Sequence, residues 1–292
     1  MKIGIYGKYV NEKYKESIYK IFEVFVEFQI SLWIHRSYAK VLKESFPNIF
    51  ERLIINNSEL MPVDLDFMIS IGGDGTFLEA FASLKMKNIP LLGINTGRLG
   101  FLADISHDEV EKTMERLLNK DYLIEKRSVI KTELSKDQGI SFPYAINDVT
   151  VHKRDSSSMI TIHAYLNNEY LTTYWADGLV ISTPSGSTAY SMSAGGPIVT
   201  PDSQSLIITP IANHNLTVRP LVLPDTNNIL LKIEGRQSKF LLSLDSRSYV
   251  IEESLEIEIY KTIEPMNLVK FKDMSYYNTL RNKLMWGVDK RN

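Results

Sequence analysis

The chain has 292 residues, 33 of them basic and 35 acidic, a formal charge of −2, and no cysteine. This length allows a large buried core in one or two domains, and the near-neutral charge argues against a broad surface for nucleic acid. The lack of cysteine excludes disulfides, thiolate zinc sites and a cysteine nucleophile, and it is typical of a reducing cytoplasm. The five histidines are scattered without a metal-ligand spacing, no apolar stretch could cross a bilayer, and the first residues resemble a strand rather than a signal peptide. We therefore expect a cytoplasmic protein without a membrane or nucleic-acid partner.

Strand and helix patterns alternate over roughly the first 120 residues. Apolar residues spaced from Ile18 to Phe28 predict a helix with one buried face, and a capping box at Ser106 opens a helix in which residues 110, 114, 117 and 118 share a face. Strands are predicted at Lys2–Tyr6, Leu53–Ile55, Phe67–Ile71 and Pro90–Ile94. Such alternation predicts an open, mostly parallel α/β sheet, in which ligands bind at the carboxyl ends of the strands.

A glycine-rich turn, Gly72-Gly73-Asp74-Gly75-Thr76, follows the strand at Phe67–Ile71. We expect Thr76 to cap the next helix, so that backbone amides and the helix dipole form a seat for an anion. A carboxylate among phosphates is repelled unless it binds a cation or accepts a proton, so Asp74 suggests phosphoryl transfer. The alternative is an ordinary Asp-Gly turn.

A second strand-and-glycine element runs from Leu91 to Leu102 and combines the next predicted strand with a glycine-rich loop. Consecutive strand ends often line one crevice, so Arg98 is a candidate phosphate partner and Phe101 a candidate wall for a flat base. The alternative is that the glycines only shape the loop and that Phe101 belongs to the core.

Near residue 121 the pattern changes to the period of two that is typical of strands, and it continues to about residue 271. Alternation at 160–166 and 255–260, with an Asn167-Asn168 turn, predicts a β-rich domain. Helical spacing returns from Ser275 to Met285, where the chain could pack back on the first domain. We expect an α/β domain at 1–125, joined by a returning helix at 272–292, and a β-rich domain at 126–271.

Polar residues interrupt this β-rich region at two places. Asn147-Asp148 lies within a strand-like run, which indicates a bulge or a site where these side chains are needed; a hairpin turn is the alternative. The stretch 176–197 sets an apolar strand between Asp177 and a run of small hydroxyl residues and glycines, with Tyr190 as a stacking face. This composition suits a nucleoside pocket, although a serine-rich surface loop is the alternative.

In these motifs the sequence resembles the NAD kinase family. The resemblance extends through Gly195-Gly196-Pro197 and 209–212 to Arg219-Pro220-Leu221-Val222, so it covers most of the chain. It implies transfer of the γ-phosphoryl group of ATP to the 2′-hydroxyl of the adenosine ribose of NAD, with Mg²⁺ on the ATP phosphates. It also implies a Rossmann- or phosphofructokinase-like α/β first domain, a β-sandwich-like second domain, a C-terminal helix that returns to the first domain, and homo-oligomers, often tetramers.

The resemblance also suggests roles for particular residues. Asp74 would be the catalytic proton acceptor and would contact the substrate together with Gly75. The other residues expected to bind the dinucleotide are Asn147, Asp148, Asp177, Thr188, Ala189, Tyr190, Ser191, Met192, Ser193 and Ala212.

The chain departs from the family pattern at three places: Asp148 replaces a glutamate, Trp175 replaces a frequent arginine, and Asp245-Ser246-Arg247 replaces Asp-Gly-Gln. Two rival functions are possible, and the first of them uses the same glycine turn. A diacylglycerol- or sphingosine-type lipid kinase would need an apolar acceptor groove, for which the 188–193 segment is too polar. A non-catalytic dinucleotide sensor would bind its ligand without Asp74.

Overall fold

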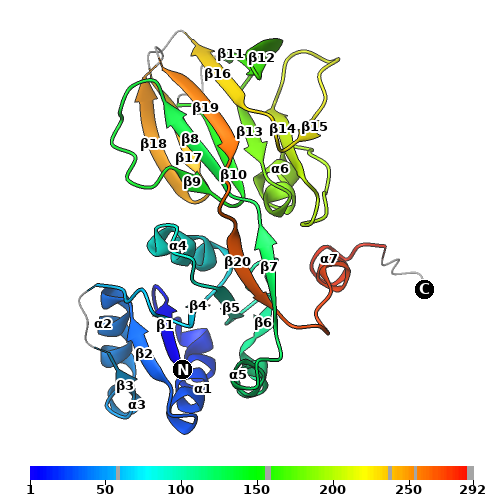
Figure 1. Cartoon of the computed structure of the whole chain (residues 1–292). Helices are drawn as coiled ribbons and strands as arrows, with labels where there is room; N and C mark the ends of the chain where they lie inside the picture. Colours follow the sequence, from blue (N-terminus) through cyan, green and yellow to red (C-terminus); the bar gives the residue numbers. More distant parts are fainter. Residues whose placement is uncertain (57–59, 155–158, 236–238, 253–254, 288–292) are drawn as a thin grey trace. The chain divides into compact units, whose positions relative to one another are not determined.

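The computed structural model describes residues 1–56, 60–154, 159–235, 239–252 and 255–287 (Figure 1). The chain forms two compact units, Met1–Glu125 with Asn267–Asn292, and Lys126–Met266. Strand β20 pairs with β5 and so lies largely in the first unit. Its alternating pattern had placed it in the predicted β-rich domain at 126–271. None of the helices among the described residues is long and apolar enough to span a membrane.

The first unit is an α/β sheet in the order β3-β2-β1-β4-β5-β20-β7, with β6 paired to β5. The strand pairings from β3 to β20 are parallel, as the alternating pattern predicted. Its elements are β1 (Lys2–Tyr6), η1 (Glu12–Tyr14), α1 (Lys15–Glu27), β2 (Ser31–Ile34), α2 (Arg36–Ser45), α3 (Pro47–Phe50), β3 (Ile54–Ile55), β4 (Phe67–Ile71), α4 (Asp74–Leu84), β5 (Leu91–Asn95), β6 (Ile105–Ser106), η2 (His107–Glu109), α5 (Val110–Leu118), β7 (Leu123–Arg127), β20 (Met266–Lys270) and α7 (Tyr276–Leu284).

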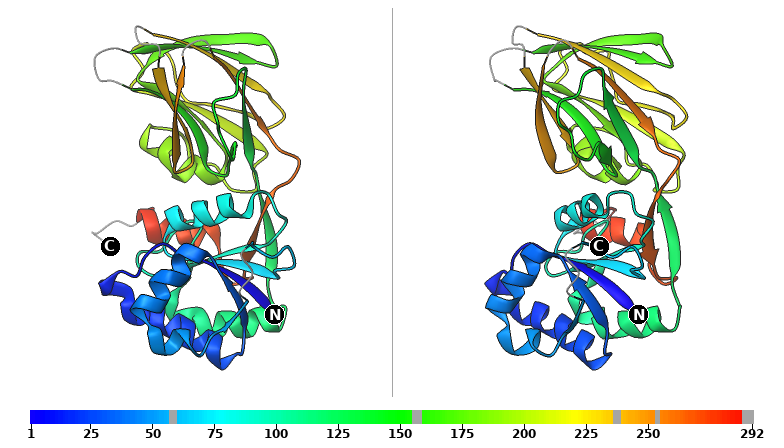
Figure 2. Two further views of the ribbon diagram at one scale, coloured as in Figure 1. Left: turned by 90° about the vertical axis from the view of Figure 1, so that its left-hand side faces the viewer. Right: turned by 60° about the vertical axis from the view of Figure 1, so that its left-hand side comes forward.

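Side-chain alternation along the strands divides the helices between the two faces of this sheet. One apolar core joins Phe67, Ile69 and Ile71 of β4 to helices α1, α2, α3 and α5. Helix α4 lies on the opposite face, where a Cβ at Gly93 would stand 3.0 Å from Phe77 (Figure 2). The capping box at Ser106 is confirmed, but it opens a 3₁₀ turn before α5, and Leu118 is exposed rather than part of the buried face.

The second unit is a sandwich of two six-stranded antiparallel sheets, ordered β15-β14-β13-β10-β17-β18 and β12-β11-β16-β19-β8-β9. One apolar core joins the inward-facing residues of both sheets, which explains the period of two, and Asn167 and Asn168 form the β11–β12 turn with positive φ. Its elements are β8 (Ile130–Leu134), β9 (Tyr144–Ala145), β10 (Asp148–Lys153), β11 (Ile160–Leu166), β12 (Glu169–Ala176), β13 (Gly178–Ser182), η3 (Ser185–Thr188), α6 (Tyr190–Ser193), β14 (Ser205–Ile211), β15 (Leu221–Pro224), β16 (Ile229–Glu234), β17 (Lys239–Leu244), β18 (Arg247–Glu252) and β19 (Glu256–Lys261).

Candidate functional site

The glycine turn connects β4 to α4 and leaves open space at the start of the helix. Gly72 has a φ of +148°, and a Cβ there would lie 2.5 Å from the Thr76 hydroxyl, so this position requires glycine. A Cβ at Gly73 or Gly75 would meet no described atom within 4 Å. The helix begins at Asp74 with Gly73 as its N-cap, so the prediction that Thr76 caps the helix is wrong. The first turn of α4 is therefore accessible to a ligand.

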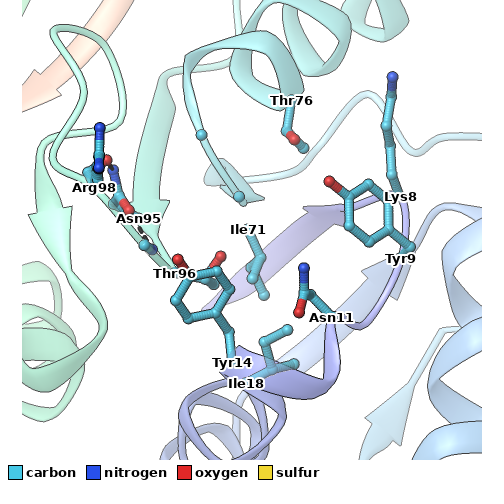
Figure 3. A pocket seen from close by; sticks show the side chains of 13 residues that line it. Lys8, Tyr9, Asn11, Tyr14, Ile18, Ile71, Thr76, Asn95, Thr96 and Arg98 are labelled. Carbon is cyan, nitrogen blue, oxygen red and sulfur yellow. Dashed lines mark hydrogen bonds between the residues drawn. The ribbon is translucent and has the colours of Figure 1, made fainter.

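A cavity of about 210 Å³ lies beside this turn (Figure 3). Lys8 and Arg98 lie on opposite sides of it, and Thr76 contributes a hydroxyl from α4. The remaining lining residues are Tyr9, Asn11, Tyr14, Ile18, Ile71, Gly72, Gly73, Asn95, Thr96 and Gly97. Two cations beside a helix N-terminus favour an anionic ligand. Phe101 does not line this cavity, and its ring packs 6.2 Å from that of Tyr276.

The side chain of Asp74 points into the loop that follows β5. One carboxylate oxygen, Oδ1, accepts hydrogen bonds from the amides of Leu102 (3.0 Å) and Ala103 (2.9 Å). The other, Oδ2, accepts the amide of Phe101 (2.9 Å) and the ammonium of Lys283 on α7 (3.0 Å). Both oxygens of Asp74 are thus held by donors, which fixes the orientation of the carboxylate.

These contacts keep Asp74 ionised. Burial acts most strongly and raises the pKa of Asp74, but the Ala103 amide, the charge of Lys283 and the Phe101 amide together outweigh it, so the pKa of Asp74 lies below its ordinary value. The carboxylate can therefore accept a proton or a cation contact throughout the neutral pH range.

The second unit holds a buried pair of carboxylates, Asp148 and Asp245, next to Asn147. Strand β9 ends at Ala145 and pairs with β8 in one sheet, whereas β10 starts at Asp148 and pairs with β13 and β17 in the other. Ile146 and Asn147 therefore connect the two sheets, and a hairpin turn is excluded. Asp245, in the turn between β17 and β18, accepts the amides of Ile146 (3.0 Å), Asn147 (2.8 Å) and Asp148 (3.2 Å). Asn147 is 8% exposed, and its buried Oδ1 has no partner among the described residues. A buried acceptor of this kind favours a ligand that brings a donor.

Burial raises the pKa of both carboxylates, and their neighbours differ. Burial, followed by the charge of Asp245, raises the pKa of Asp148 to about 7. Burial also raises the pKa of Asp245, but three backbone amides and the Arg247 cation oppose this effect. Asp245 is therefore the better stabilised anion, and Asp148 holds the proton of the pair near neutrality. Arg247 donates hydrogen bonds to the backbone carbonyls of Phe142 and Tyr144, so it has a structural role in this unit.

The hydroxyl-rich segment serves partly to hold the fold. Ser187 donates to the carbonyl of Pro184 (2.7 Å), and Ser191 is fully buried with its hydroxyl 2.8 Å from that of Thr209. Gly186 passes so close to Asn147 that a Cβ would lie 2.1 Å from the Asn147 carbonyl oxygen, so this segment and Asn147 lie side by side. Of the residues predicted to bind a dinucleotide here, Thr188, Ala189 and Met192 are half-buried, and Tyr190 and Ser193 are exposed.

Two other predicted binding residues, Asp177 and Ala212, lie apart from this cluster. Asp148 pairs with Ser182 at one end of β13, whereas Asp177 precedes Gly178 at the other end, roughly 15 Å away at about 3.3 Å per residue. The amide of Asp177 donates to Ile211 (2.9 Å), and its carboxylate pairs with Lys153 (2.5 Å). Ala212 is exposed with a φ of +47°, a strained conformation for alanine.

Sequence reasoning missed three residues of this arrangement. Asp245 was noted only as part of a broken motif, and its position in a turn after a strand was the available signal. A Cβ at Gly100 would stand 2.0 Å from Asp74 Oδ1, and its place in a glycine-rich loop hinted at such an approach. Lys283 had no signal, because only the fold brings it to Asp74.

Family models cover most of the chain: the ATP-NAD kinase N-terminal domain matches residues 34–122 and the ATP-NAD kinase C-terminal domain matches residues 146–271. The NAD kinase of Flavobacterium psychrophilum is 43% identical and that of Bacteroides fragilis 41% identical, each over 100% of both chains. The NAD kinase of Porphyromonas gingivalis is 39% identical over 98% of both chains.

Solved structures share the fold. The yeast NADH kinase complexed with NADH has a TM-score of 0.86 at 24% identity and covers 99% of this chain and 89% of its own. The NAD kinase from Archaeoglobus fulgidus in complex with ATP has a TM-score of 0.74 at 24% identity and covers 98% of this chain and 99% of its own. The resemblance inferred from the glycine turn and the hydroxyl block is thus confirmed: the chain belongs to the NAD kinase family.

Proposed function

We propose that this protein transfers the γ-phosphoryl group of ATP to the 2′-hydroxyl of the adenosine ribose of NAD, with Asp74 as the proton acceptor. The observation that carries the assignment of Asp74 is its position as the first residue of α4, next to open space at Gly73 and Gly75. The family relationship supports the overall reaction, and nothing in it favours a lipid acceptor or a non-catalytic sensor.

The cavity beside the glycine turn suits the phosphates of ATP. Lys8 and Arg98 supply positive charge, and the amides at the start of α4 supply hydrogen-bond donors. The neighbour from Archaeoglobus fulgidus was solved in complex with ATP, which is consistent with a triphosphate in this fold.

Residues of the second unit would recognise NAD. The unpartnered Oδ1 of Asn147 can accept from an adenine amino group or a ribose hydroxyl, and Asp148 can share a proton with a diol. Tyr190 offers an exposed ring for stacking, and Thr188, Ala189, Met192 and Ser193 lie near enough to the surface to contact a ligand. Ser191 fits a structural role better, because its hydroxyl is already bonded to Thr209.

A magnesium ion would enter with ATP. The described residues contain no group of three or more side chains that could cage a metal, but Asp74 lies beside the proposed phosphate seat. Because three amides and the Lys283 ammonium already hold both oxygens of Asp74, the substrate phosphates rather than this carboxylate would hold the ion, as is common for Mg²⁺ in kinases. When bound, Mg²⁺ would neutralise phosphate charge and so reduce its repulsion of the Asp74 carboxylate.

Asp177 and Ala212 remain proposed dinucleotide contacts, separated from Asp148 by the length of β13. One ligand could touch both groups by running along the strand, or a second copy of the chain could supply one of them. We propose a homo-oligomer that acts in the cytoplasm, and sedimentation equilibrium with and without NAD would test the assembly.

The decisive experiment compares Asp74→Asn with the unchanged protein and with Asp64→Asn, an exposed acid that pairs with Lys2. Each is incubated with Mg-ATP and, in parallel, NAD, NADH, diacylglycerol or fructose 6-phosphate, and products are identified by mass and phosphorus NMR. We expect NADP from the unchanged protein and from Asp64→Asn, and a loss of about 10²–10⁴-fold in kcat for Asp74→Asn. Full turnover by folded Asp74→Asn would refute the role of Asp74, and product from the lipid alone would refute the proposed acceptor.

A further inference from the structure

Three separate segments of the first unit meet at the carboxylate of Asp74: the start of α4, the loop at residues 100–103, and the C-terminal helix α7. The loop contributes three amides and α7 contributes the ammonium of Lys283. Lys283 and the Phe101 amide bind the same oxygen, Oδ2. The helix therefore completes the set of donors around a residue that lies more than 200 positions earlier in the chain.

The ammonium of Lys283 is held in place by more than its ion pair. It lies 4.5 Å from the centre of the Phe101 ring, so one residue of the loop provides both an amide to Asp74 and an aromatic face to Lys283. Helix α7 is anchored by Leu280, which is 9% exposed, and by the ring of Tyr276, 6.2 Å from that of Phe101. The lysine side chain is 31% exposed, so it is shielded from part of the solvent that would weaken the pair.

Other charged groups around Asp74 have partners of their own. Asp104, next to Ala103, pairs with Lys270 on β20, and Glu79 on α4 pairs with Lys8. Lys283 is the cation whose charge acts on Asp74 in this environment. Lys283 therefore forms a specific ion pair with Asp74 and, among the described residues, does not belong to a wider network of surface charges.

We propose that Lys283 is a positioning residue that orients the carboxylate of Asp74 for catalysis; this inference rests on the proposed function of Asp74. The amides at 101–103 hold the carboxylate from one side, and the ammonium of α7 fixes Oδ2 from another. Without Lys283, the three amides remain but the carboxylate loses its only described donor on the α7 side, so Oδ2 is no longer fixed from that side and can shift. A misplacement of about 1 Å in a catalytic group can cost about 10²-fold in rate, so the variant should lose kcat rather than substrate affinity.

The test uses the full-length enzyme and four variants: Lys283→Met, which keeps most of the apolar stem, Lys283→Arg, Arg281→Met and Asp74→Asn. Arg281 is a matched control because it is an exposed cation on the same helix that contacts Asn278. We expect Lys283→Met to lower kcat by about 10- to 100-fold with KM for ATP and NAD changed less than threefold. Lys283→Arg should recover most of the lost kcat, and Arg281→Met should match the unchanged enzyme.

A double variant separates positioning from a structural effect. If Lys283 acts through Asp74, then Lys283→Met should change kcat by less than twofold when Asp74 is already asparagine. An unchanged or increased kcat in Lys283→Met, or a higher KM for ATP with kcat retained, would overturn the inference, because the lysine would then be dispensable, inhibitory or a direct ligand of the donor. In each of these cases a loss of activity in Asp74→Asn would still support the proposed function, so the two failures can be told apart.

Discussion

Replacing Gly100 with alanine should move Asp74 without changing any charged or polar side chain. The backbone at Gly100 does not have a positive φ, so alanine is allowed there and the effect is purely one of contact. The new Cβ would stand 2.0 Å from Asp74 Oδ1, 2.7 Å from its Cγ and 2.8 Å from the carbonyl oxygen of Ala103. Carbon and oxygen atoms need more than 3 Å, so the carboxylate must shift by about 1 Å.

This shift breaks the hydrogen bonds that orient Asp74. Oδ1 accepts hydrogen bonds from the amides of Leu102 and Ala103, and hydrogen bonds to charged groups contribute about 1.5–3 kcal/mol each. Before any relaxation, the protein therefore loses several kcal/mol of interaction free energy at Asp74. We expect kcat to fall by about 10²-fold, since a misplacement of about 1 Å has that effect, with KM for NAD changed less than threefold. Formation of NADP from NAD and Mg-ATP, followed with a coupled dehydrogenase, measures both constants.

Gly235→Ala provides the matched control, because its Cβ would press on the Phe240 ring at 3.0 Å, in the second unit. It should lower the melting temperature slightly and leave kcat unchanged. If folded Gly100→Ala keeps kcat within threefold of the unchanged enzyme, the 100–103 loop does not hold Asp74 during turnover, and the assigned orientation is wrong.

Three further predictions concern the second unit. Because burial and Asp245 raise the pKa of Asp148 to about 7, the native protein keeps a proton that the unfolded chain releases above about pH 4. Stability should therefore fall as the pH rises from about 4 to 7, and Asp148→Asn should flatten this dependence in melting curves. Ser191→Ala should destabilise by about 1 kcal/mol in urea unfolding through loss of its Thr209 partner, with KM for NAD unchanged. Arg247→Ala should cost about 1–2 kcal/mol in the same assay, with kcat unchanged, because the guanidinium binds two backbone carbonyls.

Periodicity was sufficient to predict the fold class, because the two kinds of sheet bury side chains differently. The period of two from residue 160 to 166 places Ile160, Ile162 and Ala164 in the sandwich core, as expected. The boundary residues were harder, because caps depend on the exact path of the chain: α4 starts at Asp74 rather than after Thr76. Strand β20 reads like its β-rich neighbours, and only its pairing with β5 places it in the first sheet.

The candidate site was predictable where a local motif carried it, and not where distant segments meet. Gly72 to Thr76 form a turn that local sequence specifies, so the position of Asp74 at the end of β4 followed from the motif. The hydrogen bonds from the amides of residues 146–148 to Asp245 join residues almost 100 positions apart. The contact between Lys283 and Asp74 joins residues 209 positions apart. Nothing in the spacing of such residues encodes their distance in space.

The contacts of Asp74 bear on how much of the catalysis it can provide. Three amides and a lysine stabilise its anionic form, and this same stabilisation makes the carboxylate a weak base. A strong base would need the opposite surroundings, with its pKa raised toward neutrality. Phosphoryl transfer proceeds through a loose transition state in which the bond to the attacking oxygen is barely formed. Little positive charge therefore develops on the hydroxyl, its proton leaves late, and a weak base in the right place is sufficient. We therefore expect variants that move Asp74, such as Gly100→Ala, to lose more activity than any change that merely alters its acidity.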